Sequence, residues 1–333
     1  MASTIHDVAR LAGVHASTVS RVLNGKSAIT DRTRERVYAA MKQLDYHPNS
    51  MARSLASGLA GMIGLVLDTA DESSFHNADF SSSQFAIERV AQAHGYHLVI
   101  ANGAHLAAGA VQALVLERKV DGLILPPSGA NLSLLSRLDR FPCVMLGQPA
   151  GQYPDASWVD IDNELGAVMA VRHLLSRGYA SVGFLGSQTQ ETMDFVGRRV
   201  RGYYRALPPG ARAWVCPTDG TPEDACRAAM ACLREEKHPR AFVCNDNFCA
   251  FGLLRAAAAL GLRIPEDLGV VTFNDYPLAA YTDPPLTAVH IDTTLMGERT
   301  AELLFQHIGR EARHEQILLP PSLIVRASSG REE

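Results

Sequence analysis

This chain of 333 residues has little of three things: long apolar runs, paired cysteines and aromatic side chains. No apolar run reaches about 18 residues, which argues against a membrane span. The first twelve residues lack the apolar core of a secretory signal, so we expect a cytoplasmic protein. Its six cysteines form no C-x-x-C pair, which predicts reduced, mostly buried thiols, with a zinc site as the alternative.

Sequence patterns typical of catalysis are also missing. Gly58, Gly61 and Gly64 are spaced by three, which fits neither a dinucleotide nor a phosphate loop, and no G-x-S-x-G occurs. The twelve histidines show no metal-ligand spacing. Asp160 and Asp162 alternate on a predicted strand and so point to opposite faces, which is unsuited to paired acid–base work. We therefore expect no enzyme, no cofactor and no metal site.

The charge is unevenly distributed along the chain. The formal net charge is −4, yet residues 1–60 hold eight Lys or Arg against four acids. The remaining residues hold 23 bases and 31 acids, a net −8. A basic head on an acidic body suggests that only the head has a polyanionic partner.

Three short helices are predicted in the first sixty residues. Thr4 caps the first helix, which ends at Gly13, a residue that tolerates positive φ. A tight turn leads to a second helix over about 16–24, and Thr30 caps a third over about 31–44. This layout is typical of a helix-turn-helix DNA reader, whose second helix enters the major groove.

The second predicted helix supplies most of the candidate DNA contacts. Arg21 has the fork that reads guanine, although a phosphate contact or a surface ion pair would also suit it. Ser20 and Asn24 are better placed for the DNA backbone. The predicted DNA contacts in this head are Thr4, Ala16, Ser17, Thr18, Ser20, Arg21 and Asn24.

The body alternates short apolar runs with helical patterns. Predicted strands cover 62–67, 97–100, 120–125, 143–146, 159–162, 182–185, 241–244 and 268–273. Predicted helices cover 83–94, with Phe85 among its apolar residues, 111–118, 166–176, 199–207 and 295–308. This βαβ rhythm predicts parallel sheets covered on both faces. Two such sheets would form a bilobed body that resembles periplasmic sugar-binding proteins.

Two segments carry a longer resemblance. The first runs from Thr4 to Val14 and continues from Ser17 to Gly25; the second runs from Tyr46 through Asn49 and Arg53 to Leu55. Together they resemble the lactose-repressor (LacI/GalR) family of bacterial transcription regulators. The resemblance implies that residues 50–60 form a hinge helix on operator DNA, with Leu55 wedged into the minor groove. Asn49 and Arg53 join the predicted DNA contacts, although Leu55 could instead be a linker residue.

The same resemblance implies an all-α helix-turn-helix domain at 1–49 and a periplasmic-binding-protein-like α/β body at 61–333. The N-lobe is expected at about 61–160 and 292–320, and the C-lobe at about 161–291 and 321–330. No heptad run ends the chain, so a homodimer is expected rather than a coiled-coil tetramer.

Residues just after strands are the candidate effector contacts, because open α/β sheets bind ligands at the carboxyl ends of strands. Arg199 matches the family's cleft-facing Arg, whereas Arg198 and Arg201 suit the surface better. Asn245 matches a ligand-contacting position, and Asn274 stands where many relatives carry an acid. The predicted effector set is Arg199, Asn245, Asn274, Asp275, Phe75 and Gln148.

These observations predict a repressor of a sugar-utilisation operon. Its partners are palindromic double-stranded operator DNA and a small effector, a sugar or, second, a purine or nucleoside. The competing class is a solute-binding module or sugar-acting enzyme on the same body. The basic head and the missing catalytic cluster count against it.

Overall fold

The computed structural model describes residues 3–23, 29–46, 58–67, 78–102, 110–135, 138, 141–187, 195–309 and 314–330. It divides into two compact units, a head at Met1–Gly61 and a body at Met62–Glu333. Within the described residues, no helix combines the length and apolarity that crossing a membrane requires.

The head contains three helices, α1 (Ile5–Ala12), α2 (Ala16–Leu23) and α3 (Asp31–Gln43). The predicted caps of α1 are confirmed: Thr4 and Asp7 form a capping box, and Gly13 closes the helix at φ 63°. Thr30 caps α3 by accepting a hydrogen bond from the Thr33 backbone N–H. The three helices share a small core of Val8, Ala9, Ala12, Val19, Val22, Val37 and Ala40.

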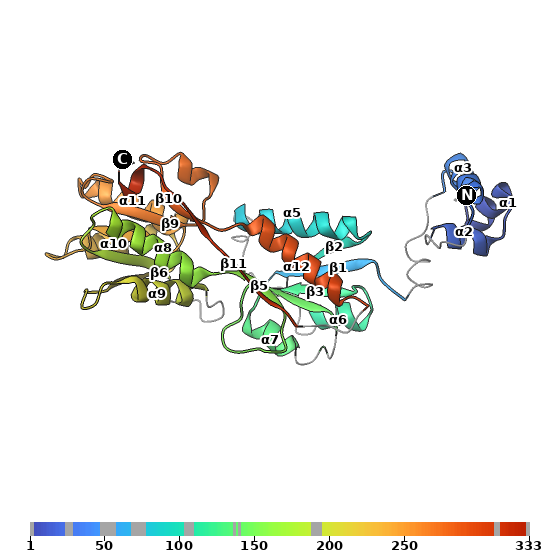
Figure 1. The fold of residues 1–333 in the computed structure, drawn as a ribbon, viewed down its shortest axis with the longest axis horizontal. Helices are drawn as coiled ribbons and strands as arrows, with labels where there is room; N and C mark the ends of the chain where they lie inside the picture. Colours follow the sequence, from blue (N-terminus) through green and yellow to red (C-terminus); the bar gives the residue numbers. More distant parts are fainter. Residues whose placement is uncertain are drawn as a thin grey trace. The chain divides into compact units, whose positions relative to one another are not determined.

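The N-lobe of the body is built on a six-stranded parallel sheet in the order β11-β5-β4-β3-β1-β2. Its strands are β1 (Met62–Leu67), β2 (His97–Asn102), β3 (Gly122–Leu125), β4 (Cys143–Leu146), β5 (Trp158–Ile161) and β11 (Gln316–Leu319). Helices α5 (Ala78–Ala93) and α12 (Thr293–His307) pack together on one face (Figure 1). Helices α6 (Ala110–Leu116) and α7 (Gly129–Leu135) cover the other.

The C-lobe has the sheet order β12-β10-β9-β8-β6-β7. Its strands are β6 (Val182–Ser187), β7 (Trp214–Thr218), β8 (Ala241–Cys244), β9 (Gly269–Phe273), β10 (Thr287–His290) and β12 (Ser322–Ile324). Only the β10–β12 pair is antiparallel among the described strands. The helices are α8 (Asn163–Ser176), α9 (Phe195–Ala206), α10 (Pro222–Leu233) and α11 (Asn247–Ala259), with short 3₁₀ turns η2 (Pro277–Ala280) and η3 (Ala327–Ser329).

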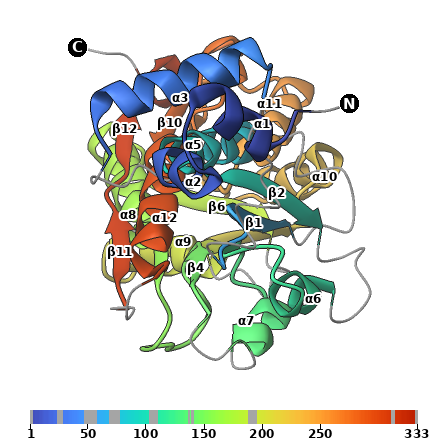
Figure 2. The ribbon, with the colours of Figure 1, turned by 90° about the vertical axis from the view of Figure 1, so that its right-hand side faces the viewer.

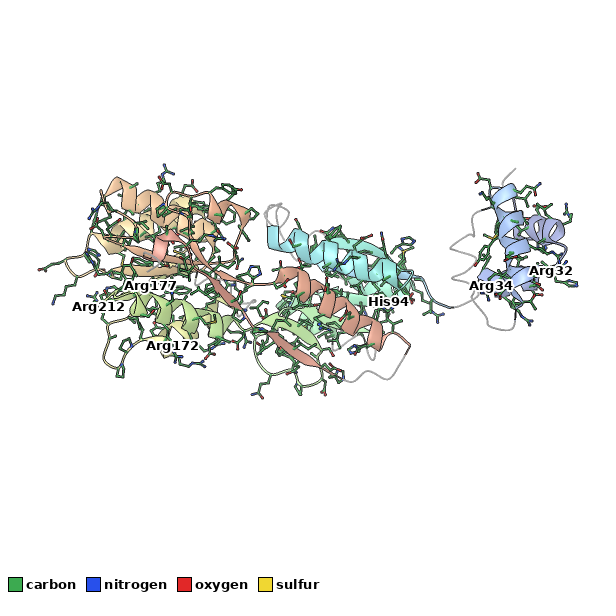
Figure 3. The ribbon with its side chains drawn as sticks, turned by 45° about the horizontal axis from the view of Figure 1, so that its top comes forward. Arg32, Arg34, His94, Arg172, Arg177 and Arg212 are labelled. Atoms are coloured by element: carbon green, nitrogen blue, oxygen red, sulfur yellow. The ribbon has the colours of Figure 1, made fainter. Side chains whose placement is uncertain are left out.

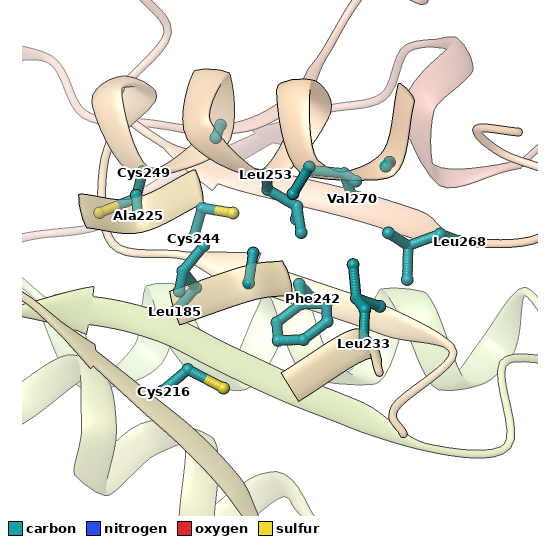
Figure 4. Close-up of a cluster of buried hydrophobic side chains, with 14 of the residues drawn as sticks. Leu185, Cys216, Ala225, Leu233, Phe242, Cys244, Cys249, Leu253, Leu268 and Val270 are labelled. Atoms are coloured by element: carbon teal, nitrogen blue, oxygen red, sulfur yellow. The ribbon is translucent and has the colours of Figure 1, made fainter. Parts of the chain in front are cut away.

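The helices of the C-lobe form two layers around its sheet. Helices α8 and α9 bury one face with Val171, Tyr203 and Phe273, and α10 and α11 bury the other with Phe242 and Leu253 (Figure 4). The chain passes between the lobes after β5, after β10 and after β11. Figure 2 shows the last two strands, β11 and β12 (red), along one side of the two sheets.

The predicted periodicity was wrong at several elements. Helix α5 begins at Ala78 rather than Ser83, and Phe85 lies 68 % exposed instead of facing the core. Helix α7 and strands β7, β10, β11 and β12 were not predicted at all. Each of these is seven residues or shorter. None is a continuous apolar run like the four-residue strands β4 and β8, so no pattern distinguished it from a loop.

Candidate functional site

The exposed side of α2 is the first candidate surface. Ser17 and Arg21 are exposed and lie one turn apart, while Val19 and Val22 between and beside them are buried in the head core. Ala16, Thr18 and Ser20 are half-buried at the edges of this surface. The helix therefore offers a hydroxyl and a guanidinium on one face, which is the geometry that base reading requires.

Further basic side chains of the head lie on α3, where Arg32 is exposed and Arg34 is half-buried (Figure 3). Arg36 serves a structural purpose, because its guanidinium donates to the carbonyl oxygens of Ala12 and Gly13 at the end of α1. The head thus carries exposed positive charge on more than one helix, as phosphate contacts require.

Thr4 has a structural role that the structure makes explicit. Its hydroxyl donates to Asp7 Oδ2 at 2.7 Å, and its backbone N–H donates to the same oxygen at 3.0 Å. These hydrogen bonds hold the pKa of Asp7 below its ordinary value. The DNA contact of Thr4 stays a prediction, as do those on α2. Asn24, Asn49, Arg53 and Leu55 lie outside the described residues.

Arg199 is the centre of the second candidate site. Its side chain on α9 is buried, and Nε donates to Asn163 Oδ1 at 2.9 Å. Nη1 donates to both the backbone oxygen and Oδ1 of Asn245, which directly follows β8. The guanidinium also lies 4.0 Å from the ring centre of Phe273. Neutral oxygens and an aromatic face thus hold a buried cation.

Asp160 on β5 supplies a buried carboxyl group close to this arginine. It accepts hydrogen bonds from the backbone N–H groups of Ile161 at 2.7 Å and Gln148 at 2.9 Å. Asn163 Nδ2 lies 3.5 Å from Asp160 Oδ1, so Asn163 stands between Asp160 in the N-lobe sheet and Arg199 in the C-lobe. A hydrogen-bonded chain from Asp160 through Asn163 and Arg199 to Asn245 therefore connects the two sheets.

Burial raises the pKa of Asp160, while the two backbone N–H groups and the charges of Arg199 and Arg198 act in the opposite direction. The folded chain holds this proton to a higher pH than the unfolded chain does. The stability that it contributes is therefore present below the ordinary pKa and lost as pH rises through the folded value.

Asp160→Asn is expected to flatten this part of the pH dependence. We predict that the urea midpoint falls less steeply in the variant than in the parent chain as pH rises above 3.8, the ordinary pKa of the group, because the buried titration is gone. The exposed Asp155→Asn is the control and should keep the parent slope. Identical slopes for Asp160→Asn and the parent would show that Asp160 does not titrate in this way.

The remaining predicted effector residues have distinct positions. Asn274 is buried at φ 66°, and Asn247 Nδ2 donates to its carbonyl oxygen at 2.7 Å, which joins the start of α11 to the end of β9. Gln148 reaches the cluster through its backbone N–H on Asp160. Phe75 lies outside the described residues.

Two contacts were not foreseen. The Asp275 carboxylate makes a two-fold ion pair with Arg326, at 2.6 and 3.0 Å, which anchors the C-terminal segment, and its effector contact stays a prediction. Arg198 is half-buried rather than a plain surface residue, and its Nη2 donates to the Pro149 carbonyl oxygen at 3.0 Å. That bond joins the C-lobe to the segment after β4.

Sequence reasoning missed Asp160, Asn163 and Asn247. Asp160 was set aside because Asp162 points the other way, and Asp162 indeed caps α8 through the Leu165 N–H at 2.8 Å. The strand pattern correctly separates the two acids, but it does not show that Arg199, nearly forty residues later, lies close to Asp160. Asn163 and Asn247 are each the first residue of a helix that follows a strand, and this position could have identified them as candidate site residues.

Comparison with known proteins finds relatives for both parts of the chain. Residues 4–49 match the model for "Bacterial regulatory proteins, lacI family", and residues 171–329 match a "Periplasmic binding protein-like domain". The HTH-type transcriptional repressor PurR of Erwinia tasmaniensis is 32 % identical over 98 % of this chain and 96 % of its own length. PurR of Aliivibrio salmonicida is 29 % identical over 98 % of both.

Solved structures show the same architecture. The lac repressor dimer bound to operator and the anti-inducer ONPF has a TM-score of 0.82 at 27 % identity, covering 99 % of this chain and all of that one. The complex of the transcriptional regulator CelR with cellobiose has a TM-score of 0.73 at 28 % identity, covering 98 % and 99 %.

A DNA-reading head joined to an effector-binding α/β body defines a transcriptional repressor with a regulatory domain. The chain belongs to the LacI family of bacterial regulatory proteins. Members of this family are transcription regulators and not enzymes.

Proposed function

We propose that the chain represses a sugar-utilisation operon and that a sugar or sugar derivative, bound between its lobes, controls its affinity for operator DNA. The observation that carries this proposal is the buried chain from Asp160 through Asn163 and Arg199 to Asn245. Every member can donate or accept hydrogen bonds, and both sheets contribute to it.

The side chains in this hydrogen-bonded series are suited to binding neighbouring hydroxyl groups of a sugar. A guanidinium fork donates to two oxygens at once, and amide side chains both donate and accept. The aromatic face of Phe273 is already occupied by the Arg199 guanidinium, which favours polar recognition over base stacking. CelR, similar to this chain over almost its full length, forms a complex with cellobiose.

Control of DNA binding follows if the effector favours one arrangement of the lobes. The Arg198–Pro149 and Asn163–Asp160 contacts connect the lobes, so a ligand that replaces or adds to them changes the free-energy difference between lobe arrangements. Operator affinity then shifts by the effector's differential affinity for the two arrangements. The predicted hinge at 50–60, with Leu55 as a minor-groove wedge, is the element that this shift would order or release.

A homodimer is the proposed functional form, because a palindromic operator presents the same half-site twice. The body exposes large apolar side chains that a second copy could cover, including Tyr281 at 85 % and Leu278 at 64 % exposed. We therefore expect the intact chain to sediment as a dimer.

Tyr281→Asp combined with Leu278→Asp is expected to convert this dimer to a monomer, because two charges would have to be buried in an apolar interface. Sedimentation velocity at micromolar concentration measures the change. Leu116→Asp is the matched control, since Leu116 is also exposed, at 73 %, but lies on α6. A double variant that still sediments as a dimer would place the interface elsewhere.

A thermal-shift screen of the intact chain against sugars and nucleobases tests the effector class. A ligand at 100 times its dissociation constant stabilises the folded state by about 2.7 kcal/mol, enough to move the melting temperature by a few degrees. We expect a sugar to give this shift in the parent chain and in Arg201→Ala, whose side chain is exposed on the same helix. Stabilisation by nucleobases alone would overturn the sugar assignment.

A further inference from the structure

A cavity lies in the C-lobe at the end of the sheet opposite to Asn245. It has a volume of about 440 Å³, within the range of about 300–1,000 Å³ that small-molecule sites occupy. Its lining includes residues 177–180, Arg240 and residues 265–267, which precede strands β6, β8 and β9. These strands are parallel neighbours, so their amino-terminal ends lie at one edge of the sheet, whereas Asn245 follows the carboxyl end of β8. This cavity, called here the Arg240 cavity, is therefore separate from the Arg199 cluster.

Arg240 supplies the first cation of this cavity, and its backbone is fixed on both sides. Its N–H donates to the carbonyl oxygen and to the hydroxyl oxygen of Ser181, each at 3.1 Å. Its carbonyl oxygen accepts a hydrogen bond from the Gly269 N–H at 3.0 Å. The side chain is exposed, and among the described residues its guanidinium group has no hydrogen-bond or ion-pair partner. The donors of this group are therefore available to a ligand.

Arg177 supplies the second cation and ends helix α8. Its backbone N–H donates to the carbonyl oxygens of His173 at 3.0 Å and Leu174 at 3.2 Å, which fixes the point where the side chain begins. The exposed side chain, labelled in Figure 3, passes Gly330, where an added Cβ would lie 3.7 Å from the Arg177 Cβ. Two guanidinium groups that line one cavity suit a ligand with several anionic acceptor oxygens.

Tyr179 gives the Arg240 cavity a rigid aromatic wall. Its ring packs against the backbone of Gly269, where an added Cβ would lie 2.4 Å from the Tyr179 Cζ. Its hydroxyl donates to the carbonyl oxygen of Pro265 at 2.8 Å. Because the ring is held both along its side and at its hydroxyl, the organic part of a ligand can pack against it without reordering it.

The two carboxylates in the lining do not cancel the two arginines. Asp267 accepts three hydrogen bonds from Arg263, from the backbone N–H at 3.0 Å, from Nε at 2.9 Å and from Nη2 at 3.3 Å. These hydrogen bonds lower the pKa of Asp267 to about 2, so its charge is matched by a cation outside the lining. Glu266 is exposed and leaves one carboxylate against the guanidinium groups of Arg177 and Arg240.

We propose that the Arg240 cavity binds a small phosphate monoester, with the phosphate on Arg177 and Arg240 and the organic part against Tyr179. A phosphate monoester carries a charge of about −1.5 to −2 near neutral pH and three strong acceptor oxygens, so it can accept from two guanidinium groups at once. A carboxylate offers one charge and two oxygens. The body outside the head has a net charge of −8, so an anion needs local cations of this kind to bind there.

A saturation-transfer NMR titration of the intact chain with phenyl phosphate tests this site, at about 0.15 M salt so that non-specific attraction is screened. We expect saturable binding to the parent chain and at least about tenfold weaker binding to Arg240→Ala and to Arg177→Ala, because each loses charge-assisted hydrogen bonds. Arg240→Lys keeps the charge but not the planar fork and should lie between. Arg255→Ala should bind like the parent, because Arg255 is an exposed arginine on α11 that does not line the cavity.

Succinate, titrated in the same way, distinguishes a dicarboxylate site from a phosphate site and should bind more weakly than phenyl phosphate. The proposal is overturned if the parent chain shows no saturable binding, if succinate binds more tightly, or if Arg240→Ala and Arg177→Ala bind phenyl phosphate as the parent does. Loss of binding in Arg199→Ala with Arg240→Ala unchanged would place the anion between the lobes and would also overturn it. The signal comes from phenyl phosphate itself and requires neither operator DNA nor a sugar, so the result is independent of the proposed function.

Discussion

Replacing Arg199 by alanine is expected to remove the response to the sugar effector while leaving operator binding in place. Arg199 is buried and donates to Asn163 and Asn245, so the effector would lose its central cationic fork. Truncating one partner of a buried charged hydrogen bond costs about 2–5 kcal/mol, or roughly 30- to 5000-fold in effector affinity. The head, which holds the predicted DNA contacts, forms a separate unit.

Titration of the effector by thermal shift and by operator anisotropy measures this loss. Arg199→Lys keeps the charge but not the two-fold geometry, and it should lie between the parent and Arg199→Ala. Arg201→Ala removes an exposed arginine from the same helix and should behave like the parent. An Arg199→Ala variant that is folded by circular dichroism and still releases operator at the parent sugar concentration would remove Arg199 from the site.

The second large effect is expected on DNA. Arg21→Ala should weaken operator binding by about 1–3 kcal/mol, roughly 5- to 150-fold, and relax specificity at one base pair. The reason is the exposed position of Arg21 one turn after Ser17 on α2.

Anisotropy titrations at fixed salt, on operator and on random duplex, distinguish base reading from phosphate contact. Arg10→Ala is the matched control, because Arg10 is also an exposed head arginine but lies on α1, paired with Asp7 at 3.5 Å. Arg10→Ala should lower the affinity only slightly, and by the same factor on both duplexes. If Arg21→Ala weakens both duplexes equally, Arg21 contacts phosphate and does not read bases.

The local signals in the sequence were sufficient for the head. Thr4 and Thr30 mark helix starts because their side-chain oxygens accept hydrogen bonds from backbone N–H groups three residues later. Gly13 marks a helix end because it tolerates the positive φ at which its backbone N–H reaches the last carbonyl oxygens of α1. In the body, Asp246 caps α11 in the same local way, by accepting a hydrogen bond from the Cys249 backbone N–H. Such caps depend on neighbours in the chain, so the printed sequence contains all the partners.

The cluster of residues between the lobes was only partly predicted, because its contacts join residues that are far apart in the sequence. Arg199 and Asn245 were predicted because they match effector-contacting positions of the family that the sequence resembles, and because they were expected near the carboxyl ends of strands. Asp160 was dismissed and Arg198 was placed on the surface, because their neighbours Gln148 and Pro149 come from a different segment of the N-lobe. The Asp275–Arg326 ion pair was not predicted, because Arg326 lies 51 residues further along the chain.

One measurement addresses the central claim, that a cleft ligand controls a DNA-reading head. Fluorescence anisotropy of the intact chain on duplexes selected from genomic fragments, at fixed salt, is recorded with and without the sugar that stabilises it. We predict a palindromic duplex bound at least about 10³-fold more tightly than random DNA, and a sugar-dependent change in that affinity that is absent in Arg199→Ala. Binding no tighter than to random DNA, or the same sugar effect in Arg199→Ala, would contradict the account.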